Sequence, residues 1–369
     1  MASGFVAALF ASFAVCWLVL AFRRAHEKLS IDDTIPGLQK VHKTPVPRIG
    51  GFGILAGVAA GALVLQKGEL RWMALYLLAA LPAFAGGFLE DLTRKVSPYS
   101  RLLFAFGAAA VGYVLLDARI SDLDLPFDDY LFQYEIFAFS FTLFAVGGFS
   151  HAANIVDGMN GLLGFVALTI LAAIAIVAWR VDDLRILQAA LILLGATAGF
   201  LVWNYPRGVL FAGDGGAYFL GFAIAELAVL LVHRNSEVSP WFALLLLWYP
   251  VWETIFSGWR RKALRGRSPA DADGLHLHTL VYRRLLRRGG PVTRSALTTL
   301  CMLIACLATA IPAVVFWDET WILQGFAVAF ALAYLWIYWR IVRFRTPRPG
   351  RTGSGTPAAG KERPTGGTL

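Results

Sequence analysis

The stretch NIVDGMNGLLGFVALTILAAIAIVAW, residues 154–179, joins a short polar segment directly to a long apolar one. The apolar part carries no charge and is long enough to cross the ~30 Å hydrocarbon core of a bilayer. The polar part holds Asn154, Asp157 and Asn160 together with glycines. The stretch therefore predicts a membrane helix with two amides and a carboxylate at one end.

The composition of the whole chain extends this prediction. Of the 369 residues, 58% are hydrophobic and only 15% are charged, which is too little polar surface for a soluble domain of this size. A transmembrane β-barrel would show repeated segments of about ten residues with alternating hydrophobicity, and the sequence has none. We therefore expect an all-α, polytopic membrane protein.

Apolar runs separated by polar breaks indicate about 11 transmembrane helices. No soluble domain remains between them, so residues 1–343 are expected to form a single transmembrane domain. Residues 344–369 are rich in Gly, Pro, Thr and basic residues and are expected to form a disordered basic tail. The expected spans are 4–22, 50–66, 71–88, 102–116, 134–149, 161–179, 186–203, 215–232, 240–257, 296–316 and 321–339.

The distribution of Lys and Arg predicts the orientation of the chain. The loops after the odd-numbered spans, together with the tail, hold 27 of the 33 Lys and Arg residues, and the other loops hold 6. Because positive residues stay on the cytoplasmic side, we expect the N-terminus outside and the tail in the cytoplasm. The net charge of +9 then faces the cytoplasm, where it suits membrane lipids or an anionic substrate. Nucleic acid is not an expected partner, because no platform of aromatic and basic residues is visible.

Five polar segments stand out, and this orientation places all of them on the cytoplasmic side. Loop polarity without a function would distribute over both faces, so this coincidence is the strongest functional signal in the sequence. The segments are VHKTPVPRIGG (41–51), GFLEDLTRKVSPYSR (87–101), NIVDGMNGL (154–162), WNYPRGVLFAGDGGAYFLG (203–221) and ETIFSGWRRKALRGRSPADADGLHLHT (253–279).

Each segment taken alone also has a structural explanation. Glu90 and Asp91 could lie at the solvated end of a helix, and Asp157 could cap the helix that follows it. A glycine turn accounts for the glycines around Asp214, but not for a carboxylate between them. The two histidines of LHLHT are two residues apart, which excludes the i, i+4 zinc pair of a helix.

Taken together, the segments point to a divalent cation and a phosphate. Several carboxylates with few thiols suit Mg²⁺ or Mn²⁺, and magnesium commonly bridges carboxylates and the phosphates of a substrate. Glycines let a backbone approach phosphate closely. Lys43, Arg48, Arg94 and Lys95 could neutralise phosphate charge. On a membrane face, this combination predicts phosphoryl transfer between a soluble nucleotide substrate and a lipid.

The segments resemble the polyprenyl-phosphate N-acetylhexosamine-1-phosphate transferases of glycosyltransferase family 4. HKTPVPRIGG matches the lead-in H-x-x-P-x-P-R-x-G-G, and NIVDGMNGL matches N-x-x-D-G-x-(N/D)-G-L in full. FAGDGG matches F-x-G-D-x-G, while GFLEDLTRKVSP and RGRSPADADGLHLHT supply the acidic pair and the histidine loop. The resemblance covers about residues 30–290. It is closer to the branch that starts O-antigen and common-antigen synthesis than to the related phospho-MurNAc-pentapeptide transferase.

The resemblance implies a reaction at the bacterial cytoplasmic (inner) membrane. Undecaprenyl phosphate attacks the sugar-linked phosphorus of a UDP-N-acetylhexosamine, UMP leaves, and an undecaprenyl-diphospho-sugar forms. Mg²⁺ (or Mn²⁺) would bridge the pyrophosphate and steady the charge on the departing UMP. The product would initiate O-antigen or another cell-envelope polysaccharide.

The same resemblance assigns catalytic roles by motif. Asp214 would be the main metal ligand and Asp91 a second one, while Glu90 would hold or deprotonate the lipid phosphate. His276 and His278 would lie by the pyrophosphate.

On the nucleotide side, the resemblance implies that Asp157, also counted among the catalytic residues, and Asn160 meet the donor. Asn204 and Phe211 would line the uridine pocket, and Lys43 would contact the nucleotide. The residues implied to bind substrate are Lys43, Arg48, Lys95, Asn154, Asn160, Asn204 and Phe211.

Three residues depart from the family pattern. Glu90 stands where Asp is usual, which leaves open how Glu90 and Asp91 divide their roles. Thr279 replaces the last His of the H-x-H-H pattern, and Gly274 replaces a common basic residue. These two changes leave open how the loop contacts sugar and phosphate.

The alternative from a different class is a secondary transporter of an anionic lipid or nucleotide sugar. Transporters place ionisable groups near the bilayer midplane, and Glu226 is expected inside a span, with no assigned role. Glu253 lies near the end of the ninth span, where the family often has Asp. Thr279 and Glu90 are also compatible with an inactive scaffold. GlcNAc, FucNAc, QuiNAc and GalNAc all remain open as the sugar, and a homodimer remains open as the assembly.

Overall fold

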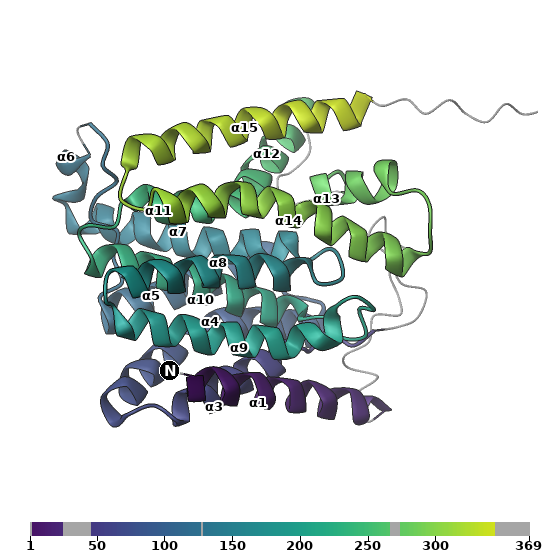
Figure 1. Cartoon of the computed structure of the whole chain (residues 1–369), viewed down its shortest axis with the longest axis horizontal. Coiled ribbons are helices and arrows are strands. Elements are labelled where there is room, and N and C mark those ends of the chain that lie inside the picture. The colour runs from purple at the N-terminus through teal and green to yellow at the C-terminus, as the bar shows by residue number, and fades with distance from the viewer. Residues whose placement is uncertain (1, 25–45, 127, 266–273, 344–369) are drawn as a thin grey trace, which may run out of the picture.

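The computed structural model describes residues 2–24, 46–126, 128–265 and 274–343, and these residues form helices and no β-strand. The helices lie side by side, and the first begins at the end of the bundle opposite the one where the last finishes (Figure 1). This confirms the all-α membrane fold. Within these ranges, nine helices are long and apolar enough to cross a membrane: α1 (Ala2–Ala21), α4 (Lys67–Thr93), α5 (Pro98–Leu116), α7 (Glu135–Val156), α8 (Leu162–Arg180), α9 (Leu184–Asn204), α10 (Gly213–Arg234), α14 (Pro291–Val315) and α15 (Thr320–Arg343).

Two of the eleven expected spans are not single long helices: one is short and the other is divided. The second is α3 (Gly51–Leu63), and the ninth is divided into α11 (Pro240–Leu246) and α12 (Trp248–Arg265). The division lies just before Pro250, which has no N–H to donate to the preceding turn. Eleven crossings and their orientation stay predictions. The expected basic tail lies outside the described residues.

The shorter elements are α6 (Asp129–Phe132), α13 (Leu277–Leu280) and a π-helical turn at Val281–Leu285. The short helix α3 packs tightly because its glycines face α1. A Cβ at Gly53 would lie 2.2 Å from Cys16 Sγ, so only glycine permits this approach. This packing holds the start of α3 at a fixed place in the bundle.

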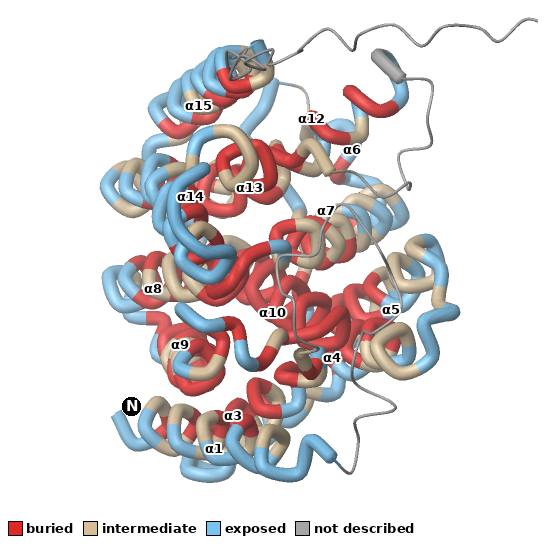
Figure 2. Tube along the Cα trace, turned by 90° about the vertical axis from the view of Figure 1, so that its right-hand side faces the viewer, coloured by how far each residue is buried: buried red, intermediate tan, exposed pale blue. Residues whose placement is uncertain are grey.

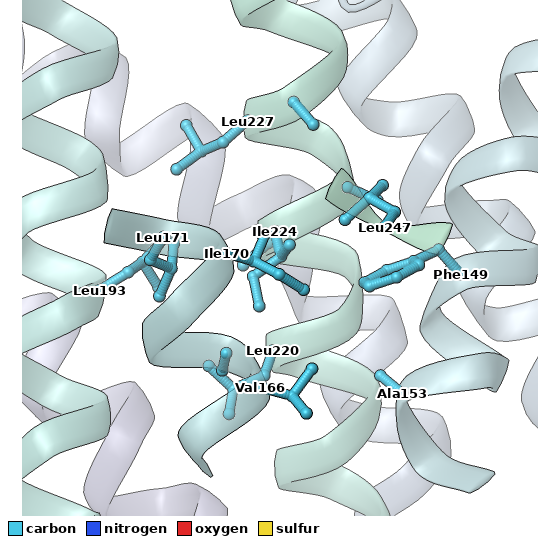
Figure 3. Packing of buried hydrophobic residues seen from close by; sticks show 14 of the residues in the cluster. Phe149, Ala153, Val166, Ile170, Leu171, Leu193, Leu220, Ile224, Leu227 and Leu247 are labelled. Carbon is cyan, nitrogen blue, oxygen red and sulfur yellow. The ribbon is translucent and has the colours of Figure 1, made fainter. Parts of the chain in front are cut away.

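Helix α10 runs through the centre of the bundle (Figure 2). Every residue from 213 to 231 is buried, and the helix packs against α4, α7, α8 and α9. Leu220 of α10 lies beside Val166 of α8, and Ile224 lies beside Ile170 (Figure 3). A membrane helix that is apolar on all sides could also face lipid, but protein surrounds α10. Its polar first turn is therefore held inside the protein at one end of the bundle.

Ion pairs close the other end of α10. Asp183, before α9, accepts hydrogen bonds from Arg234 (2.7 Å) and Asn235 (3.2 Å). Glu69 of α4 accepts two from Arg185 of α9, at 2.9 and 3.0 Å. These five residues, which we call the distal clasp, join the starts of α4 and α9 to the end of α10.

Candidate functional site

The site begins at the first turn of α10, where Asp91 of α4 caps the helix. Asp91 Oδ1 accepts a hydrogen bond from the backbone N–H of Asp214 (2.9 Å), and Oδ2 accepts one from Gly215 (2.8 Å). A carboxylate is favoured there because the first N–H groups of a helix lack partners within it. Gly213 has a φ of +74°, a conformation that favours glycine. The acidic pair and the FAGDGG motif thus meet directly.

The lead-in motif reaches the same place through backbone pairing. Gly50 N–H donates to the Phe211 carbonyl (2.8 Å), and Phe211 N–H donates to the Pro47 carbonyl (3.0 Å). Gly51 N–H donates to the Ala212 carbonyl (2.9 Å). These bonds hold the segment before α3 against the segment before α10, and the arginine between Pro47 and Gly50 is carried to the site.

Two guanidinium groups face the Asp214 carboxylate. Arg48 lies 3.4 Å from Oδ1, and Arg101 of α5 forms an ion pair with Oδ2. The Arg101 side chain is 13% exposed, whereas the Arg48 side chain is 47% exposed. Asp214 is thus held on one side by an enclosed cation and on the other by a cation that solvent reaches.

Arg101 leads to two further residues that the sequence analysis did not single out. Its guanidinium lies 5.9 Å from the centre of the Tyr218 ring, and the Tyr218 hydroxyl is 2.7 Å from His151 Nδ1. Tyr218 lies one helical turn after Asp214, and His151 lies one turn before Asn154. Their position one turn from a motif residue is the signal that could have identified them.

Asp157 follows α7 and is partly buried near this group. Its charge acts on Asp91, as does that of Arg48, so the NIVDGMNGL segment also contributes to the site. Burial raises the pKa of Asp157 to about 6, and the positive charge of Arg48 opposes that rise. Near neutral pH this carboxylate can change its protonation state.

The two histidines of the last segment complete the group. Their rings stack in parallel with centres 5.5 Å apart, and a Cβ at Gly158 would lie 2.7 Å from His278 Nε2. Burial, followed by the neighbouring His276, lowers the pKa of His278 to about 4. His278 is therefore neutral at pH 7. His276 Nδ1 lies 2.9 Å from Glu253 Oε1, so the two rings have different partners.

Glu90 lies in the last turn of α4, and Lys95 lies just after the helix. Glu90 is half-buried and accepts a hydrogen bond from the Val96 N–H (2.7 Å). Lys95 is exposed, and Arg94 has a φ of 55° that ends the helix. The turn is next to the site, because the charge of Glu90 acts on Asp91.

Two predicted nucleotide contacts are enclosed and bonded to backbone. Asn160 donates to the Pro206 carbonyl (2.9 Å), and Asn204 accepts from the Gly161 N–H (2.7 Å) and donates to the Leu210 carbonyl (2.7 Å). These bonds tie the loop after α7 to the loop after α9. Their contact with a nucleotide stays a prediction.

The remaining predicted residues divide into three cases. Asn154, in the last turn of α7, and Phe211, whose backbone is bonded to Pro47 and Gly50, are both partly buried. Lys43 lies outside the described residues. Glu226 is fully buried in α10, and neither carboxylate oxygen has a hydrogen-bond partner in the described part of the chain.

Known proteins are similar to this chain over a range that includes most of the acidic residues of the site. Positions 73–232 match glycosyl transferase family 4, a range that holds Glu90, Asp91, Asp157 and Asp214. The chain is 29% identical over 245 residues to the probable undecaprenyl-phosphate N-acetylglucosaminyl 1-phosphate transferase of Bacillus subtilis, covering 66% of this chain and 67% of that protein. It is 26% identical over 345 residues to the undecaprenyl-phosphate alpha-N-acetylglucosaminyl 1-phosphate transferase of Yersinia pestis, covering 90% and 91%.

Proposed function

We propose that the chain, which matches glycosyl transferase family 4 over positions 73–232, transfers N-acetylhexosamine 1-phosphate from a UDP-sugar to undecaprenyl phosphate. The products are an undecaprenyl-diphospho-sugar and UMP. The reaction takes place in the bacterial inner membrane and initiates O-antigen or another cell-envelope polysaccharide. The relatives named above carry this acceptor in their names, which supports the choice of lipid.

The observation that carries the proposal is the meeting of five separated segments at one end of the bundle. Asp91 caps the helix that bears Asp214, Arg48 reaches the same carboxylate, and the charge of Asp157 acts on Asp91. Gly158 lies against His278. A transporter would place these groups near the middle of the membrane instead.

In the proposed reaction, an oxygen of the lipid phosphate attacks the sugar-linked phosphorus while the bond to the UMP oxygen breaks. Arg48 and Arg101 can each donate hydrogen bonds to phosphate oxygens, since a guanidinium matches their geometry. The partly exposed Arg48 can leave Asp214 for the donor at little cost in packing. The protein thus supplies position and charge, which are the main sources of catalysis in phosphoryl transfer.

The residues of the site fit a divalent cation that is shared with the substrate. Within the described ranges, no three His, Cys, Asp or Glu side chains gather closely enough to hold a metal by themselves. Magnesium commonly needs only one or two carboxylates, because phosphate oxygens and water complete its shell. Asp214 would be the ligand. Both oxygens of Asp91 accept backbone hydrogen bonds, so Asp91 would serve mainly by fixing the first turn of α10, which carries Asp214.

The charges of the site also favour a cation. Four carboxylates gather at the site, where two guanidinium groups face Asp214, and a bound diphosphate would add further negative charge. A bound Mg²⁺ (or Mn²⁺) would neutralise charge on the diphosphate and on the leaving UMP. The residues concerned are Glu90, Asp91, Asp157 and Asp214 against Arg48 and Arg101.

A panel of donors tests the proposal. Purified protein is mixed with Mg²⁺, undecaprenyl phosphate and UDP-GlcNAc, UDP-GalNAc, UDP-FucNAc or UDP-QuiNAc, and release of UMP is measured. We expect release with at least one sugar, and none when the lipid phosphate or the metal is omitted. Folded protein that releases no UMP with any donor would refute the proposed function.

A further inference from the structure

His276 is held by a buried group that connects two helices far apart in the sequence. The imidazole Nδ1 lies 2.9 Å from Glu253 Oε1, and Glu253 of α12 is fully buried. The same carboxylate accepts a 2.6 Å hydrogen bond from the Tyr334 hydroxyl of α15 and 3.3 Å bonds from the Leu277 N–H. With Glu253 ionised, the carboxylate only accepts hydrogen bonds, and Nδ1 is then the donor in this contact.

The backbone before His276 is held by the same two helices. Arg260 of α12 donates to the Leu275 carbonyl (2.8 Å) and to the Tyr338 hydroxyl (2.5 Å). The Tyr338 hydroxyl donates in turn to the Leu275 carbonyl (3.3 Å). With Leu277 bound to Glu253, the residues on both sides of His276 are fixed. The ring therefore has little freedom to turn.

The inward face of α15 changes character where it meets this group. Its buried residues are apolar at Leu323, Ala327 and Ala331, and then become phenolic at Tyr334 and Tyr338. A helix that only crosses the membrane does not need enclosed hydroxyls, because each buried hydroxyl requires a hydrogen-bond partner. Both hydroxyls find their partners beside His276, which points to a role for α15 in the site.

The two stacked histidines are consequently different in their chemistry. His276 has its Nδ1 assigned to Glu253, and its Nε2 has no hydrogen-bond partner among the described residues. His278 has an enclosed Nδ1 with no hydrogen-bond partner in the described part of the chain. A carboxylate on one ring nitrogen fixes the orientation of the ring and what the other nitrogen can offer a ligand.

We propose that Glu253 and Tyr334 are positioning residues that hold His276 with its hydrogen on Nδ1, so that Nε2 is the atom offered to the diphosphate of the donor. The identity of that ligand rests on the proposed function, whereas the state of the ring does not. Tyr334 and Glu253 both lie outside the range 73–232 that matches the family. The last helix then supports catalysis as well as crossing the membrane.

Kinetics of conservative variants test the catalytic part of the proposal. Tyr334→Phe removes one hydrogen bond to Glu253, and we expect kcat to fall about tenfold with KM for the UDP-sugar nearly unchanged. Glu253→Gln should lower kcat about a hundredfold, because a misplaced ring loses much of its effect. Glu253→Asp, which keeps the charge, should recover part of that loss.

The matched control is Tyr249→Phe. Tyr249 is fully buried on α12, one turn before Glu253, and its hydroxyl has no hydrogen-bond partner in the part of the chain described. Its removal should leave kcat unchanged. Full activity of both Tyr334→Phe and Glu253→Gln, or an equal loss in the control, would overturn the proposal.

Nitrogen NMR of ¹⁵N-histidine-labelled protein reads the ring directly, without turnover. The chain has six histidines, and the His276 signals are identified by their loss in His276→Gln. We expect a protonated Nδ1 in the wild type and a change of Nδ1 signal in Glu253→Gln. A wild-type Nδ1 without hydrogen would overturn the proposal. A protonated Nδ1 in protein that releases no UMP would instead support the positioning of the ring and refute the proposed function.

Discussion

The two ends of α10 both carry charge, and they use it differently. In the distal clasp, each acidic side chain meets its own basic partner: Asp183 pairs with Arg234, and Glu69 pairs with Arg185. At the other end, Asp214 faces two guanidinium groups while Asp91 is bonded to backbone N–H groups. In the distal clasp, the charges are paired within the protein. At the site, the Asp214 carboxylate and the two guanidinium groups are available to a ligand.

This difference shows how one helix can carry both stability and chemistry. Helices α4, α9 and α10 each have one end in the distal clasp and the other end in the site. The distal clasp fixes one end of each of these helices. Their opposite ends, which carry the site, are thereby held at constant positions relative to one another. Substitutions at the two ends should therefore separate into losses of stability and losses of activity.

The largest expected effect is on activity, for Asp214→Asn. The amide keeps the size of the side chain but loses the charge that pairs with Arg101 and would hold the cation. We expect kcat to fall by about a thousandfold or more, which corresponds to about 4 kcal/mol of transition-state stabilisation. UMP release measures the loss, and thermal unfolding in detergent should show a folded protein. Activity within tenfold of the wild type would contradict the role given to Asp214.

The next effect is on stability, for Asp183→Asn in the distal clasp. Asp183 is 3% exposed at its side chain and holds Arg234, so the change leaves that guanidinium without its charge partner. We expect about 2 kcal/mol less stability against unfolding and a kcat within twofold of the wild type. Thermal unfolding and UMP release are measured on the same preparation. If kcat fell as far as in Asp214→Asn, the two ends would not be separable.

A smaller effect on activity is expected for Tyr218→Phe. The hydroxyl contacts His151 at 2.7 Å and the ring lies under Arg101, so the change should loosen the arginine that holds Asp214. We expect about a tenfold loss in kcat. Tyr76→Phe is the control, because that buried hydroxyl donates to the Ala223 carbonyl away from the site and should leave kcat unchanged. Equal activities in both variants would show that His151 and Tyr218 have no part in the reaction.

Sequence patterns identified most of the fold because membrane helices are long and apolar. Helices occupy all eleven expected ranges, and the exceptions have local causes such as Pro250. The alternation of the expected spans placed all five segments on one face of the membrane. Which of them come into contact on that face depends on the packing of the helices.

What the sequence could not show depends on how distant helices pack. Arg101 and Tyr218 meet because α5 packs beside α10, and Glu253 and Tyr334 meet across 81 positions of the chain. Arg101, Tyr218 and Glu253 lie in the polar segments quoted above, but nothing in those segments shows which side chains meet. The enclosure of Asn160 also could not be foreseen, because whether an amide faces a ligand or a backbone carbonyl depends on loop geometry.

The smallest effect is a pH dependence that distinguishes Asp157 from Asp183. Burial raises the pKa of Asp157 from 3.8 to about 6, so protonation stabilises the folded protein fully below pH 3.8, and this contribution is lost as pH rises through about 6. For Asp183, burial is outweighed by bonds from Arg234, the Ile186 N–H and Asn235, and its pKa is lowered. Its stabilisation is present above pH 3.8 and is lost only in stronger acid.

Lowering the pH from 7.5 to 5.5 should therefore stabilise the wild type through Asp157, with no contribution from Asp183. Asp157→Asn removes this titration, and at pH 7.5 it should be about 1 kcal/mol more stable than the wild type while losing activity. Thermal unfolding of both proteins across this range, without substrates, measures the difference, which includes the effect of the Asp157 charge on Asp91. Parallel curves would mean that the ionised Asp157 carboxylate does not lower the stability of the folded protein. The site would then carry its charge without a cost in stability, as the distal clasp does.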